Sequence, residues 1–71
     1  MNAQQTKAFL MLIDALREAI EGSGPHGIPA GHLYAMVMGH GVSLEVFEKC
    51  IGLLVEAGRV KRAPSHLLTA A

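Results

Sequence analysis

Cysteine, aromatic residues and charge are all scarce in this 71-residue chain. The single cysteine, Cys50, excludes a disulfide within the chain, and no Cys/His spacing typical of a zinc site is present. Six cations balance six acids, so the formal net charge is zero. A domain this short has a marginal core. Because it has no disulfide and no metal site to stabilise it, we expect it to associate with another chain.

Long hydrophobic runs are also absent. The longest apolar run, residues 8–13, is too short to cross a bilayer, and Asp14 follows it directly. No segment has the pattern of a signal peptide. We therefore expect a cytoplasmic protein with no membrane contact, and a single free cysteine agrees with a reducing compartment. The apolar content of 51% is high for a short soluble monomer and again indicates a partner chain.

Residue patterns that carry catalysis are missing as well. The sequence holds no nucleophile motif and no phosphate-binding loop, and its acids are not paired on one inward face. Four histidines lie scattered along the chain with no compact ligand spacing (His26, His32, His40 and His66). We expect no enzymatic activity, no metal, no cofactor and no small-molecule substrate.

What the chain does contain is helical periodicity in its first half. Asn2 and Gln5 resemble a capping box, and one apolar stripe follows them (Phe9, Leu12, Ile13, Leu16 and Ile20). The Gly-rich segment 22–25 ends this helix. A second helix is expected from Ala30 to Met38 because Pro29 suits a helix start, and Tyr34 and Met36 are expected in the core.

The second half predicts a helix followed by a hairpin. Gly39–Gly41 breaks the chain, Ser43 is a good N-cap, and Gly58 stands where a helix ends in the left-handed conformation. The buried stripe between them is expected to hold Leu44, Phe47, Ile51, Leu54 and Val55, with Cys50 at the edge of the core. Val60 and Leu67–Leu68 predict two short strands around a turn at 63–65, and Ile28 is placed to form a bridge with that hairpin.

This order of elements resembles a winged helix-turn-helix domain over about residues 6–69. The resemblance lies in HLYAMVM, the turn GHGVS, the helix LEVFEKCIGLLVEAGRV and the hairpin KRAPSHLLT. It implies a mainly α fold with a small β-hairpin, in which three helices and a C-terminal two-stranded wing form one domain over residues 1–71. It also implies that the third helix enters a DNA major groove while the wing contacts the backbone.

Charge is distributed unevenly in a way that bears on this role. Residues 1–57 carry three cations and six acids, whereas residues 58–71 carry three cations and no acid. The candidate contacts to duplex DNA are Ser43, Lys49, Arg59, Lys61 and Arg62. The outward face of the third helix carries one cation, two acids and two aliphatic residues, which is unusual for a helix that reads bases (Glu45, Val46, Lys49, Gly52, Leu53 and Glu56).

A second hypothesis concerns protein association. Val46 and Leu53 are seven residues apart on the outward face of the third helix, and Met11 lies off the main stripe of the first. We expect these three residues to form a contact surface, most simply in a homodimer. Two functions therefore stay open: a small transcriptional regulator that binds duplex DNA as a homodimer, and a winged-helix module that binds only protein.

Overall fold

The first helix, α1 (Ala3–Gly22), begins at the predicted capping box. The side-chain oxygen of Asn2 accepts a hydrogen bond from the Gln5 amide at 2.8 Å, and the Gln5 side chain accepts one from the Asn2 amide at 3.1 Å. These two bonds satisfy backbone donors that a helix start otherwise leaves free. The computed structural model describes residues 2–71, so the chain is helical almost from its first described residue.

Two further helices follow a short connector. After the 3₁₀ turn η1 (Gly24–His26) and strand β1 (Ile28–Pro29), helix α2 runs over Ala30–Met38 and helix α3 over Leu44–Glu56. Ser43 caps α3, since its hydroxyl oxygen accepts from the Val46 amide at 3.2 Å. Gly41 makes the corner between the helices with φ +84°, and Gly58 ends α3 with φ +74°. These bounds confirm the predicted helices.

A three-stranded antiparallel sheet closes the fold. Strand β2 (Val60–Ala63) and strand β3 (Leu67–Ala70) form a hairpin around the turn η2 (Pro64–His66). The strand order is β1-β3-β2, with Ile28 opposite Leu68 and Val60 opposite Ala70. The predicted hairpin and the bridge from Ile28 are both confirmed. The chain is thus mainly helical with a small antiparallel sheet, and β3 lies at the centre of that sheet.

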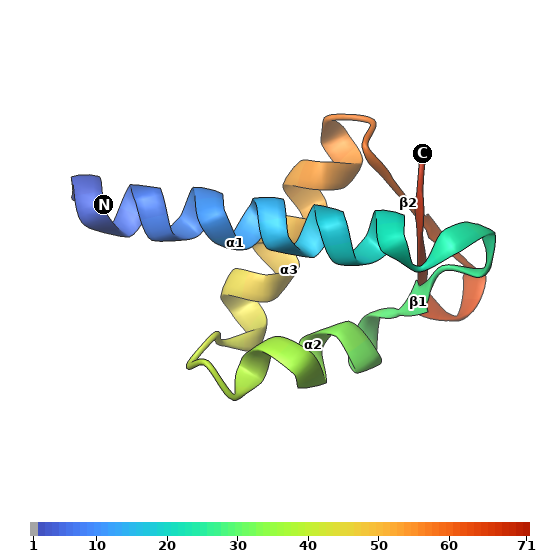
Figure 1. Cartoon of the computed structure of the whole chain (residues 1–71), viewed down its shortest axis with the longest axis horizontal. Helices are drawn as coiled ribbons and strands as arrows, with labels where there is room; N and C mark the ends of the chain where they lie inside the picture. The colour runs from blue at the N-terminus through green and yellow to red at the C-terminus, as the bar shows by residue number, and fades with distance from the viewer. Residues whose placement is uncertain (1) are drawn as a thin grey trace.

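The core sits where α1, α3 and the sheet meet. Figure 1 shows α1 crossing α3 at a steep angle, with α2 on one side of that crossing and the sheet at the far end of α1. Helix α3 supplies four buried residues, more than any other element. The buried hydrophobic residues are Leu16, Ile20, Ala30, Leu33, Phe47, Cys50, Ile51, Leu54, Val60 and Leu68. Cys50 is therefore a full core residue, beyond the edge position expected for it.

Three residues expected in the core are exposed instead. On α3, Leu44 is 55% exposed and Val55 is 41% exposed, because the buried face centres on Phe47 and Leu54 and both residues lie to one side of it. On α2, Met36 is 60% exposed, since this short helix packs through Ala30, Leu33, Tyr34 and Val37, and Met36 lies on its other side. The core placement predicted for these three residues is wrong.

Tyr34 does pack against the core, as predicted. Its ring lies 5.2 Å from that of Phe47 between centroids, and its hydroxyl donates to the Val42 carbonyl oxygen at 3.3 Å. This contact joins α2 to the start of α3 and holds the corner at Gly41 closed. None of the helices described in residues 2–71 combines the length and the hydrophobicity that crossing a bilayer requires.

Gly27 provides a test of how closely the connector approaches the sheet. A Cβ atom at Gly27 would lie 2.5 Å from the Leu68 carbonyl oxygen and 2.6 Å from Thr69 Cγ2, whereas a Cβ at Gly24 would meet nothing within 4 Å. Both glycines have φ +74°. Gly27→Ala should therefore lower the free energy of unfolding by about 2 kcal/mol more than Gly24→Ala does.

Urea denaturation of the two variants measures this difference, because both substitutions place alanine at a positive φ and only one adds a clash. Equal losses for the two variants would mean that the connector does not press against β3.

Candidate nucleic-acid interface

The predicted wing cations lie along one edge of the sheet. Arg59 directly precedes β2, and Lys61 and Arg62 belong to it. Because β2 is an outer strand, all three side chains are exposed while Val60 between them is buried at 2% exposure. The backbone there is fixed: the Arg59 amide donates to the Leu54 carbonyl at 3.0 Å, and the Arg59 carbonyl accepts from the Ala71 amide at 3.0 Å.

Arg62 also reaches the third helix. Its Nη2 atom lies 3.2 Å from Oε2 and 3.5 Å from Oε1 of Glu48. The two side chains are 35% and 47% exposed, so water screens the pair and its contribution to stability is about 0–1 kcal/mol. The contact brings the wing and α3 side by side, and it also places an acid against one of the predicted phosphate contacts.

The other two predicted DNA contacts belong to α3. Ser43 uses its hydroxyl oxygen as the helix cap, which leaves only the O–H hydrogen for an outside acceptor. Lys49 is exposed on the outward face and forms no ion pair with any residue in 2–71. Glu45 and Glu56 are exposed near the two ends of the helix.

The whole face formed by α3 and the wing is close to neutral. Its four cations are Lys49, Arg59, Lys61 and Arg62, and its three acids are Glu45, Glu48 and Glu56. The positive charge is concentrated on β2, since α3 alone carries more acids than cations. Attraction for a phosphate backbone is therefore strongest at the wing and weakest along α3.

A second, apolar feature lies between α1 and the corner that precedes α3. It is a groove of about 610 Å³ without a charged residue in its lining, which consists of Gln5, Ala8, Phe9, Leu12, Gly41, Val42, Ser43 and Val46. Of the predicted contact residues, Val46 lines this groove at 37% exposure. Met11 and Leu53 are exposed by 64% and 42% and lie outside it.

The sequence pattern places Phe9 and Leu12 on one apolar stripe with Leu16 and Ile20 and does not show a groove beside them. Phe9 and Leu12 are only half-buried. A helix of 20 residues is about 30 Å long, whereas α3 with 13 residues is about 20 Å long. The length of α1 is the signal that was available, since a helix of 20 residues extends beyond its crossing with α3 and leaves part of its apolar stripe uncovered (Figure 1).

Residues 2–71 contain no group of three or more His, Cys, Asp or Glu side chains arranged to hold a metal ion. Comparisons with protein-family models, curated proteins and solved structures found no match for this chain.

Cys50 yields a prediction about pH. Burial raises the pKa of its thiol above the ordinary value of 9.0. The thiol pKa is then higher in the native state than in the unfolded state. The free energy of unfolding is therefore unaffected well below pH 9.0 and falls as the pH rises through that value, because the unfolded chain loses the proton first. The urea midpoint of the wild-type chain should fall between about pH 7 and about pH 9.5.

Cys50→Ala is the matched comparison, since it removes the thiol at a cost that does not depend on pH. The decline should be smaller in this variant. Parallel declines for the two proteins would contradict a desolvated thiol.

Proposed function

We propose that this chain is a winged helix-turn-helix protein that binds duplex DNA and acts as a transcriptional regulator, with its affinity resting on the wing. The order of elements supports the fold, because a helix, a short strand, two helices joined by a tight corner and a hairpin follow one another. The sheet order β1-β3-β2 supports it further, since the hairpin then packs back onto the connector after α1. The charged side chains support DNA binding.

The proposal rests on three exposed cations at an outer strand: Lys61 points away from α3, whereas Arg62, the next residue, points to the α3 side and meets Glu48, and Arg59 is exposed just before the strand. Arg59 and Lys61 form no ion pair within residues 2–71, so they are available to phosphates. Arg62 adds a third contact once it leaves Glu48, which costs little for an exposed pair. Lys49 is a fourth exposed cation, on the outward face of α3.

The acids on α3 weaken its contacts with DNA. Glu45 and Glu56 repel phosphates near the two ends of the helix, and α3 offers no Arg, Asn or Gln side chain to a base edge. The proposed complex therefore depends mainly on backbone phosphates and discriminates weakly between sequences. Four neutralised phosphates correspond to a salt slope of about −3.6 per protomer.

A protein-association module is the second candidate function, and a different observation favours it. The uncharged groove beside α1 and the exposed Val46 and Leu53 lie on surfaces that the wing does not use. Exposed methionine, valine and leucine side chains are suited to burial against another protein. Protein binding at the groove is compatible with DNA binding at the wing, whereas Val46 and Leu53 share the outward side of α3 with Lys49.

The wing makes the first experimental target. Lys61→Ala should reduce the magnitude of the salt slope for duplex binding by about 0.9, and replacing Arg59, Lys61 and Arg62 together should reduce it to about −0.9. Fluorescence anisotropy of a labelled duplex, measured over a range of salt concentrations, gives these slopes. Glu48→Gln should tighten binding by roughly two- to fivefold, because it removes an acid and frees Arg62.

Ala3→Glu is the matched control for Lys61→Ala, since it lowers the net charge by the same amount at the opposite end of the molecule (Figure 1). It should leave the slope unchanged. Equal effects of the two variants would mean that only net charge matters. If the wild-type chain fails to bind any duplex at low salt, the DNA proposal is wrong and the association module remains.

A further inference from the structure

The first turns of α1 lack a packing partner within the chain. Residues 2–8 are exposed, and Phe9 and Leu12 beyond them are only half-buried. Figure 1 shows the N-terminal part of α1 extending past the crossing with α3, away from the sheet. A helical end of this length has little stability in water when nothing packs against it. Packing against a second surface would stabilise these turns and cover Phe9 and Leu12.

That surface continues around α1. Ala8, Met11 and Ala15 are all exposed, and their spacing of three and four residues places them in one row along the helix, which we name the α1 stripe. Ala8 is also a wall of the groove, so the α1 stripe and the groove form one continuous apolar surface. Met11 is 64% exposed and stands in the middle of the stripe.

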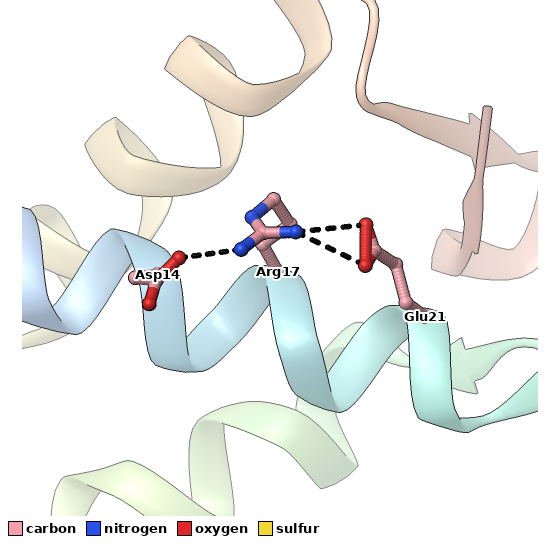
Figure 2. A network of polar contacts seen from close by, with 3 residues as sticks. All are labelled: Asp14, Arg17 and Glu21. Atoms are coloured by element: carbon pink, nitrogen blue, oxygen red, sulfur yellow. Dashed lines mark hydrogen bonds and ion pairs between the residues drawn. The ribbon is translucent and has the colours of Figure 1, made fainter.

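The charges of α1 are divided between its two halves. In the C-terminal half, Arg17 bonds to Asp14 at 2.6 Å and to Glu21 at 3.1 Å, as Figure 2 shows. The hydrogen bonds to Asp14 and Glu21 raise the pKa of Arg17. These three charges are thus satisfied within the helix.

Two charges of α1 remain without an ion pair among residues 2–71: Lys7 in the N-terminal half and Glu18 in the C-terminal half. They are eleven residues apart, which is close to three helical turns, so both lie on the same side of α1 next to the α1 stripe. This side of α1 is therefore positive at its N-terminal end and negative at its C-terminal end, where Asp14 precedes Glu18 by one turn, and the apolar α1 stripe lies beside these charges.

We propose that the occupant of this surface is a second copy of the chain, whose α1 lies antiparallel to the first. A two-fold axis near Leu12 and Ile13 then places Lys7 of each copy beside Glu18 of the other and brings the two α1 stripes together. A parallel arrangement would set Lys7 against Lys7 and Glu18 against Glu18, which is repulsive. The charge pattern therefore selects a second copy in one orientation.

The size of the surface is adequate for this assembly. A stable interface buries about 800 Å² on each partner. The chain exposes 4798 Å², so a dimer of this kind would cover roughly one sixth of it. The exposed turns of α1, the α1 stripe and the rim of the groove would contribute to this area, and the N-terminal turns of α1 extend away from the sheet (Figure 1). The inference names the partner for the protein-association candidate and does not depend on DNA binding.

Sedimentation equilibrium of the full-length chain at low salt tests the arrangement. The wild-type chain should be dimeric, and Lys7→Glu or Glu18→Lys alone should weaken the dimer by about tenfold or more, because each creates two repulsive contacts per dimer. Combining the two substitutions should restore the dissociation constant to within about threefold of the wild-type value. Circular dichroism checks that each variant keeps its helix content.

Met11→Glu and Leu10→Glu form the second pair of variants. Both residues are more than half exposed, but only Met11 belongs to the α1 stripe, so only Met11→Glu should give a monomer. A wild-type chain that stays monomeric up to about a millimolar overturns the inference. So does a dimer that is insensitive to Met11→Glu, or a double charge reversal that fails to restore it. Duplex binding by the wing is measured separately and stands or falls independently.

Discussion

The apolar face of α3 is the constraint on which the rest of this structure depends. Phe47, Cys50, Ile51 and Leu54 are nearly without solvent contact, and α1, α2 and the hairpin all pack against this helix. In a domain of 71 residues no other surface is large enough to hold these elements together. Once this face points to the core, the helical period fixes the direction of every other α3 side chain. Lys49 and the acids Glu45 and Glu56 must face the solvent, and Val46 must face the groove beside α1.

This arrangement separates two kinds of surface at opposite ends of the molecule. The wing holds the positive charge, but Glu48 and Arg62 pair across it and the face as a whole is almost neutral. Binding of an anionic partner there would have to rely on a few phosphate contacts and therefore on low salt or on two copies acting together. The far end, with the groove and the α1 stripe, is uncharged in its middle. A dimer formed at that end would leave both wings free, and the two proposals thus support each other physically.

Local signals predicted most of the fold. The capping box at Asn2 and Gln5, the cap at Ser43 and the stop at Gly58 each depend on a few neighbouring residues, and the helices begin and end where these signals stand. The wrong predictions concern residues whose burial is set by tertiary packing. Leu44 and Val55 fit the period of α3 but lie beside its buried face, and that rotation is set by α1 and the sheet. Arg62 and Glu48 are fourteen residues apart, so no local pattern predicts their pairing. The groove depends on where α1 crosses the start of α3, which no local pattern predicts.

The most direct measurement is a backbone-amide NMR titration of the chain with a short duplex at low salt. The account predicts that the largest shifts fall on Arg59–Arg62 and on Lys49, while amides from Ala8 to Ala15 keep their positions. Shifts confined to α1 and the groove, with the wing unchanged, would contradict the proposal that the wing binds DNA and the apolar surface of α1 binds protein.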